Sequence, residues 1–226
     1  MSQHNRTFNF PPSGIQCYNY GYRAVSHKLH KNVMMRYVSF LICAIVLTGC
    51  ASGPPKVQPG EQFAQKGAVV SAPSDSGWLL LEHTEESIAL ARPYPEQESV
   101  VLNTYYFWIG ETVSDDVFFE KLIEGRKQVG DEKRFNQLDV SYQNTTFQEQ
   151  SCLKYEGVAE YQQNTDKLPA GSAYFTNRGY ICRSKLDNAS AILMEISMRS
   201  ASPEMPEQTI ALGERFFSNI RLTETQ

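Results

Sequence analysis

The sequence predicts an α+β fold, in which a mainly antiparallel β-sheet carries one inserted helix and one C-terminal helix packed on it. Short segments rich in β-branched and aromatic residues follow one another from Gly77 onward, which favours strands that pair with their sequence neighbours. One segment with helical spacing interrupts this block, and a second closes it. Residues 77–222 are enough to bury a single hydrophobic core, so one folded domain is expected over residues 77–226.

The expected strands lie at 78–82, 87–91, 100–109, 138–147, 151–161, 174–183 and 191–199. The third reads Val-Val-Leu-Asn-Thr-Tyr-Tyr-Phe-Trp-Ile, with bulky residues at both odd and even positions. Alternate side chains of a strand point to opposite faces of the sheet. Such a segment therefore suits a central strand.

The inserted helix is expected over residues 114–129. Ser114 can cap its N-terminus, Asp115 and Asp116 complement the helix dipole in the first turn, and Gly130 ends the element. Residues at helical spacing follow the cap, namely Phe118, Phe119, Leu122, Ile123 and Arg126.

The closing helix is expected to start at Ser202-Pro203-Glu204, which supplies a cap, a proline at the first helical position and an acidic first turn. It should run to about Asn219. One face would carry Ile210, Gly213, Phe217 and Ile220.

A leader precedes the domain. Arg36 is followed by an apolar run at 37–47 and then by small residues, the pattern of a secretory signal peptide at 34–49. The run is too short to span a bilayer, which takes about 20 residues. A buried core helix is the alternative, but the polar, Pro- and Gly-rich sequence that follows leaves it no adjacent partner.

Leu47-Thr48-Gly49-Cys50 resembles the lipobox of bacterial lipoproteins. The resemblance implies cleavage before Cys50, diacylglycerol on its thiol and acylation, for example by palmitate, of the new amine. Ala51 and Ser52 follow without an Asp, which resembles lipoproteins released to the outer membrane. The expected location is a lipid anchor in the outer membrane with the domain facing the periplasm; the inner membrane and the cell surface stay open.

Two segments flank this signal. Residues 1–33 show no sustained period, and translation that starts at Met34 or Met35 would explain them. Residues 50–76 are rich in Gly, Pro, Ser and Gln, which is typical of a flexible tether behind the lipidated cysteine.

Charge and histidine content exclude some functions. Five of the 21 basic residues and none of the 25 acidic ones precede Cys50, so the remainder has a net charge near −9. Such an acidic domain lacks the basic surface of a nucleic-acid binder. Beyond the leader His83 is the one histidine, so no metal site and no cofactor is expected, and His83 is interpreted as a surface residue.

Cys152 and Cys182 are the cysteines left after processing and lipidation, and the oxidising periplasm favours a disulfide between them. A hairpin of 151–161 and 174–183 centred near Lys167 places these two residues opposite each other. The same register pairs Glu156 with Arg178 and Leu153 with Ile181, and it sets Tyr155 over Gly179. A structural bond is favoured over a redox switch, because no Cys-x-x-Cys spacing is present.

Four consecutive aromatic residues form a candidate contact patch, Tyr105, Tyr106, Phe107 and Trp108. Core packing is the favoured interpretation of these residues, and a protein or small-ligand contact patch is the alternative. No catalytic residue is assigned, since the sequence has no Gly-x-Ser-x-Gly elbow, and the helix dipole accounts for the Asp115/Asp116 pair.

The element order, from Gly77-Trp78 through the helix at 114–129 to the ending Phe216-Phe217-Ser218-Asn219-Ile220-Arg221-Leu222, resembles the Mog1/PsbP-like α/β sandwich. This resemblance implies a binding or accessory subunit, and the expected location makes an unknown envelope protein the expected partner. An envelope hydrolase with an unrecognised carboxylate or serine site is the alternative.

Overall fold

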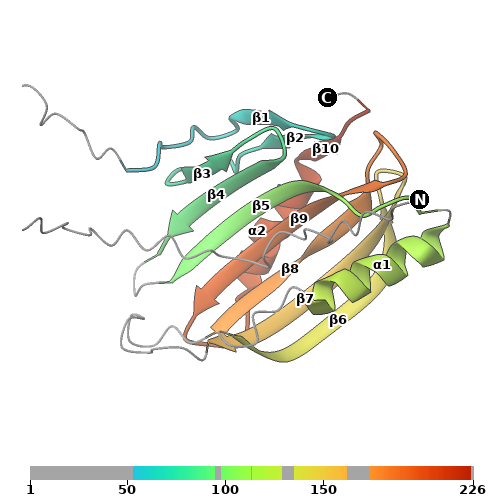
Figure 1. Cartoon of the computed structure of the whole chain (residues 1–226). Coiled ribbons are helices and arrows are strands. Elements are labelled where there is room, and N and C mark those ends of the chain that lie inside the picture. The colour runs from blue at the N-terminus through green and yellow to red at the C-terminus, as the bar shows by residue number, and fades with distance from the viewer. Residues whose placement is uncertain (1–52, 95–97, 113, 129–134, 162–173, 225–226) are drawn as a thin grey trace, which may run out of the picture. The chain divides into compact units, whose positions relative to one another are not determined.

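The computed structural model describes residues 53–94, 98–112, 114–128, 135–161 and 174–224 (Figure 1). The expected signal peptide and Cys50 lie outside the described residues. No helix among those that are described has the length and apolar character needed to cross a bilayer.

A seven-stranded sheet forms the centre of the domain, and every neighbouring pair in it is antiparallel. Across the sheet the strands are β3 (Leu79–His83), β4 (Ser87–Pro93), β5 (Ser99–Trp108), β9 (Ser190–Ser200), β8 (Tyr174–Arg183), β7 (Gln150–Tyr161) and β6 (Phe135–Phe147). Each strand expected from the sequence is present, and β5 lies inside the sheet. The α+β prediction is confirmed.

A second sheet has the order β1-β2-β10 and consists of β1 (Gln62–Gln65), β2 (Ala68–Ser71) and β10 (Ile220–Leu222). Strands β1 and β2 lie within the expected tether, so the tether prediction is wrong for residues 62–71. The error arose because each strand has only four residues and buries every second one, within a segment that is polar as a whole. The buried residues are Phe63, Gln65, Ala68 and Val70. The fold therefore begins well before Gly77.

The inserted helix, α1 (Asp115–Gln128), agrees with its expected bounds, and the Ser114 hydroxyl accepts the Val117 N–H at 3.3 Å. The closing helix, α2 (Glu207–Ser218), begins later than expected, with extended Pro206 as its N-cap. A start at Pro203 would make Pro206 the fourth helical residue, where proline lacks the N–H that closes the first turn. Ile220 also belongs to β10 and not to the helix.

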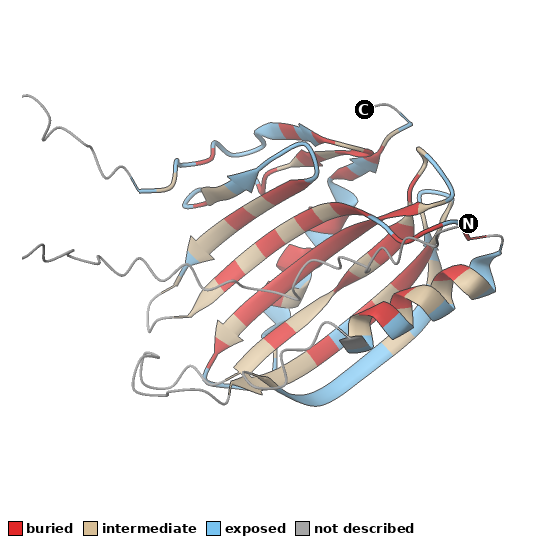
Figure 2. Ribbon diagram, viewed as in Figure 1, coloured by how far each residue is buried: buried red, intermediate tan, exposed pale blue. Residues whose placement is uncertain are grey.

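The two helices cover opposite faces of the large sheet (Figures 1 and 2). The α2 face packs against α2 and the small sheet; its core includes Leu102, Ile196 and Phe216. The α1 face packs against α1 through a smaller core that includes Phe107, Phe118 and Leu193. Each central strand thus supplies alternate side chains to two separate cores.

A tight turn ties the far end of β6 to the small sheet. Gln148 and Glu149, between β6 and β7, have backbone φ angles of 47° and 67°. Residues other than glycine rarely adopt this backbone conformation. The Gln148 side chain donates to Ile220 O at 2.5 Å and accepts from the Leu222 N–H at 2.9 Å. These two bonds to β10 hold the strained turn in place.

Candidate functional site

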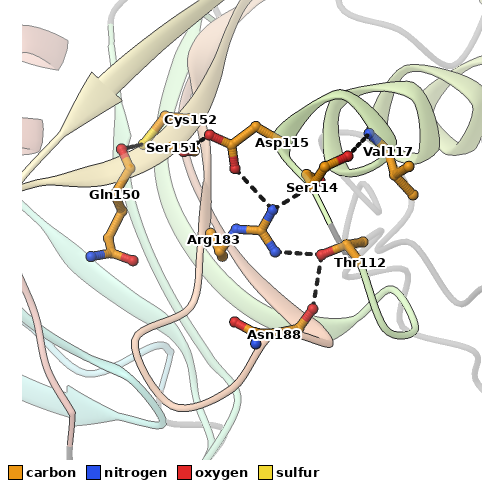
Figure 3. Close-up of polar contacts among 9 residues, drawn as sticks. All are labelled: Thr112, Ser114, Asp115, Val117, Gln150, Ser151, Cys152, Arg183 and Asn188. Carbon is orange, nitrogen blue, oxygen red and sulfur yellow. Dashed lines mark hydrogen bonds and ion pairs between the residues drawn. The ribbon is translucent and has the colours of Figure 1, made fainter.

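A polar cluster around Arg183 fixes the N-terminus of α1 on the sheet (Figure 3). Arg183, at the end of β8, donates to Asp115 Oδ1 at 3.0 Å and to Ser114 O at 3.2 Å. It also donates to Thr112 Oγ1, which itself donates to Asn188 O at 2.9 Å. The guanidinium carbon lies 4.5 Å from the centre of the Phe118 ring. One arginine therefore joins the helix N-terminus, the segment before it and β8.

Asp115 receives a second bond from the neighbouring strand, because Ser151 Oγ of β7 donates to Asp115 Oδ2 at 2.5 Å. The hydrogen bond from Ser151 lowers the pKa of Asp115 and is the largest effect; burial opposes it, and the hydrogen bond and charge of Arg183 lower the pKa further. Asp115 stays 56% exposed, so its ion pair with Arg183 is screened by water. The Arg183 cluster orients a helix end more than it stabilises the fold.

The Cys152–Cys182 disulfide lies beside this cluster and is confirmed. The two residues are direct partners in the β7–β8 register, with Cα atoms 4.0 Å apart and both side chains fully buried. The other pairings expected for the hairpin are confirmed as well, including the Arg178–Glu156 ion pair at 2.7 Å. Ser151 and Arg183 adjoin the two cysteines, so the bridge joins the strands that carry both partners of Asp115.

A second cluster lies under the C-terminal half of α1 and is built around Glu195 of β9. This side chain is 1% exposed. Its carboxylate accepts from Tyr155 Oη at 2.7 Å and from Asn177 Nδ2 at 3.1 Å. Arg126 of α1 stacks on the Tyr155 ring, with its guanidinium carbon 3.8 Å from the ring centre, and bonds to Tyr142. The Glu195 cluster thus takes one residue from each of β6, β7, β8, β9 and α1.

Two glycines make room for this cluster. A Cβ at Gly179, which pairs with Tyr155, would lie 2.0 Å from the backbone oxygen of Met194. A Cβ at Gly157 would lie 2.6 Å from the side-chain oxygen of Asn177. A larger residue at Gly179 would collide with the backbone of β9, and one at Gly157 would collide with Asn177, which donates to the buried carboxylate.

Burial dominates the acid–base properties of the Glu195 cluster. It raises the pKa of Glu195, although the charge of Arg126 and the hydrogen bonds from Tyr155 and Asn177 act in the other direction. Burial and the Glu195 charge raise the pKa of Tyr155 well above its ordinary value. The pKa of Arg126 is raised by Tyr155 and Glu195, which outweigh the lowering effect of burial.

A buried acid with a raised pKa is a feature of many catalytic sites. Here the carboxylate already accepts two hydrogen bonds from side chains of the sheet and is almost completely enclosed. A substrate would have to displace Tyr155 or Asn177 to reach it. The arrangement therefore acts as an internal anchor that holds α1 to four strands of the sheet.

The four candidate aromatic residues do not form one surface. Tyr106 and Phe107 are buried in the α2-face and α1-face cores respectively. Tyr105 is half-buried and stacks on Phe107 with ring centres 6.1 Å apart. Trp108, at 48%, is the one side chain of the four with a large exposed area. Whether any of them contacts a partner stays a prediction.

His83 is exposed, as expected, and its Nε2 lies 3.1 Å from Ala64 O. Asp116 is also exposed in the first turn of α1. Within the described ranges no three His, Cys, Asp or Glu side chains are arranged to hold a metal ion.

The sequence alone predicts no role for Glu195. It places Arg126 at helical spacing with the apolar residues of the inserted helix but identifies no residue that it contacts. A signal was present, because Glu195 interrupts the apolar strand Ala-Ile-Leu-Met-Glu-Ile-Ser-Met, and Arg126 continues the apolar stripe of α1. Opposite charges at two inward positions indicate a buried pair. The strand pairing that brings them together could not be read from either segment alone.

Comparison with known proteins gives distant structural likenesses. No protein-family model and no curated protein matches the chain. A protein from Bacteroides thetaiotaomicron is similar, with a TM-score of 0.43 and 15% identity. The match covers 74% of this chain but only about half (49%) of that protein's length. PsbP from Synechocystis gives a TM-score of 0.39 and 11% identity, and covers 78% of this chain and 99% of its own. The Ran-binding protein Mog1p of Saccharomyces cerevisiae gives 0.36 and 10%, and covers 75% and 95%. The two protein types named in the expected resemblance are thus among the similar structures, at a level that carries no functional assignment.

Proposed function

We propose that this chain is a lipid-anchored protein of the bacterial cell envelope, whose domain acts in the periplasm as a non-catalytic binding or accessory subunit. The observation that carries the proposal is the leader ending in Leu47-Thr48-Gly49-Cys50. A thiol at the new N-terminus is the group that lipidation requires. Several acyl chains on it would anchor the protein stably, since each buried methylene contributes about 0.8 kcal/mol.

The buried disulfide supports an oxidising compartment. Cys152 and Cys182 face each other on adjacent strands, and their neighbours Ser151 and Arg183 bond to one carboxylate. A bond built into the fold in this way suits a protein that folds outside the cytoplasm, where disulfides persist.

The accessory role is supported by how the titratable groups of the domain are used. The groups with perturbed pKa values on this face are Glu195 and Tyr155 under α1 and Arg126 on it; Tyr155 contacts both of the others and fastens α1 to the sheet. These groups stabilise the position of α1 by contacts with one another, which favours binding at the surface over catalysis in the interior.

The lipid is tested by metabolic labelling with an alkyne analogue of palmitate in the native host. We expect label on the wild-type chain and on Cys43→Ser, a matched change inside the leader, and none on Cys50→Ser. Label on Cys50→Ser, or an unmodified soluble wild-type chain, would contradict the proposal. Density-gradient separation of the labelled membranes then tests the outer-membrane location, which rests on Ala51 and Ser52.

The accessory role is tested by crosslinking in intact envelopes followed by affinity capture of the full chain. We expect a distinct envelope protein to be captured with the wild type and to be depleted with Cys50→Ser, which removes the anchor but leaves the domain unchanged. Turnover of an envelope substrate by the purified protein, with no partner captured, would favour an envelope hydrolase instead.

A further inference from the structure

The two edges of the large sheet differ in how they are protected. The edge strand β3 has five residues and a bulge between Leu80 and Glu82, and residues 55–57 run beside it. Pro55 O accepts the Leu80 N–H at 2.9 Å, and Trp78 O accepts the Val57 N–H at 2.9 Å. Length, irregularity and cover all discourage further pairing at this edge.

The opposite edge, β6, has 13 residues, and its outer side pairs with no other strand in the described part of the chain. Figure 2 shows that most of it is exposed. Its irregularity is confined to the bulge between Gln137 and Asp139, where the Gln137 amide bonds to Asp139 O and Val158 O. The remaining nine residues, 139–147, form a regular strand whose outer backbone groups can pair with another strand.

The chemistry of this segment favours pairing. It reads Asp-Val-Ser-Tyr-Gln-Asn-Thr-Thr-Phe, with no proline, no lysine and one charged residue, Asp139. Charged residues and proline are the usual means of blocking an exposed edge. Val140, at 40%, and Leu138, at 48%, are among the large apolar side chains that the fold leaves exposed.

We propose that β6 is an interface for a second copy of this chain, and that two copies pair antiparallel about a two-fold axis at Gln143. Gln143 is the centre of the regular segment 139–147. In this register Val140 lies opposite Thr146, Ser141 opposite Thr145, and Asp139 opposite Phe147. Each pair lies on one face of the sheet, and the two Asp139 carboxylates are far apart. The register therefore brings no like charges together and pairs a β-branched residue with a threonine and a serine with a threonine, as an isologous strand pair requires.

The helices leave room for such a dimer. α1 packs over β7, and in the joined sheet β7 and its copy are three strand spacings apart, about 14 Å. Helices packed side by side need about 8–10 Å. The α1 helices of the two copies can therefore lie on the same face without collision. The proposal does not depend on lipid at Cys50.

The register is tested by disulfide trapping of the full chain in intact cells. Gln143→Cys brings the two new thiols opposite each other at the axis, and we expect a covalent dimer under oxidation. Asn136→Cys is the matched control, since it is exposed on the same strand but lies beyond the bulge. The wild type provides the background from native cysteines. Equal dimer from both variants, or none from Gln143→Cys, overturns the proposal.

Introducing a charge at the axis gives a second, independent test with two epitope-tagged copies expressed together. Two copies with Gln143→Lys place like charges opposite each other, and we expect recovery of one copy with the other to fall by roughly fivefold. A Gln143→Lys copy with a Gln143→Glu copy should restore it. Two Asn136→Lys copies should pair like the wild type. Undiminished pairing of the Gln143→Lys copies, or a loss that Gln143→Glu does not restore, overturns the proposal, as does capture of other proteins without a second copy.

Discussion

The two faces of the large sheet are covered by different means. On the α2 face, apolar side chains of β4, β5 and β9 meet α2 and the small sheet in the larger of the two cores. On the α1 face, a smaller core is flanked by the Arg183 cluster at one end of α1 and the Glu195 cluster toward the other. Burial of apolar area is non-directional, whereas hydrogen bonds to a buried carboxylate require a defined distance and angle. The α2 face should therefore determine stability, and the α1 face should determine where one helix sits.

The largest effect is expected from Phe216→Ala on the α2 face. Phe216 is 2% exposed and contacts Phe217, with ring centres 5.9 Å apart. Removing a buried phenyl ring costs about 3–5 kcal/mol of unfolding free energy. Urea unfolding followed by circular dichroism measures this change. Gln208→Ala, exposed on the same helix, is the control and should shift the free energy by less than about 0.5 kcal/mol. Similar shifts for the two variants would mean that α2 is not part of the core.

The disulfide lies in the α2-face core and links β7 to β8, the strands that carry the partners of Asp115, and its loss should have the next largest effect. It closes a separation of 30 residues, so the double variant Cys152→Ala/Cys182→Ala should lose about 3.5 kcal/mol in the chain-entropy model. Because Ser151 and Arg183 hold Asp115, hydrogen exchange should also increase in the first turn of α1. A reductant should destabilise the wild type and leave the double variant unchanged. Two free thiols in the native protein would contradict the bridge.

Local patterns explain which parts of the fold could be predicted. The β7–β8 register followed from several residue pairs within one hairpin, and Cys152–Cys182 followed from that register. The small sheet could not be predicted in the same way. Its three-residue strand β10 pairs with β2, about 150 residues earlier, and no feature of Ile-Arg-Leu identifies that partner. The start of α2 could have been found, since Pro206 rules out a helix that begins at Pro203.

The candidate site shows the same division. Ser114 as an N-cap and Asp115 as a first-turn acid were visible in sequence, because both act on the helix that contains them. Arg183 and Glu195 act on α1 from strands that are distant in the chain. Their roles depend on the strand order β9-β8-β7-β6, which places four strands under one helix. Local periodicity contains no information about that order.

On the α1 face, Tyr155→Phe should have an intermediate effect. The change removes the Oη that donates to Glu195 at 2.7 Å and keeps the ring on which Arg126 stacks. A lost hydrogen bond to a buried charged group costs about 1.5–3 kcal/mol. Tyr174→Phe, a half-buried tyrosine outside the cluster, serves as the control and should cost less. If both changes have the same small effect in urea unfolding, the Glu195 cluster does not anchor α1.

The raised pKa of Glu195 makes the anchor sensitive to pH. A carboxyl group whose pKa is higher in the folded state holds its proton more tightly there. Its contribution to stability is therefore complete below its ordinary pKa of 4.5 and declines as pH rises through the raised value. Glu195→Gln, which cannot titrate, should remove this decline. Urea unfolding over a range of pH measures it, and identical pH profiles for the two proteins would contradict a buried, titrating Glu195.

The smallest effect is expected from Asp115→Asn in the Arg183 cluster, and it should have the opposite dependence on pH. Because the pKa of Asp115 is lowered in the folded protein, its contribution is present above the ordinary value of 3.8 and is lost as pH falls through the lowered one. The side chain is 56% exposed, so the loss should stay below about 1 kcal/mol. Asp116→Asn, in the same exposed first turn, is the matched control. A loss with Asp115→Asn that is greater than that with Tyr155→Phe would reverse the ranking of the two clusters, and the Arg183 cluster would then be the main anchor of α1.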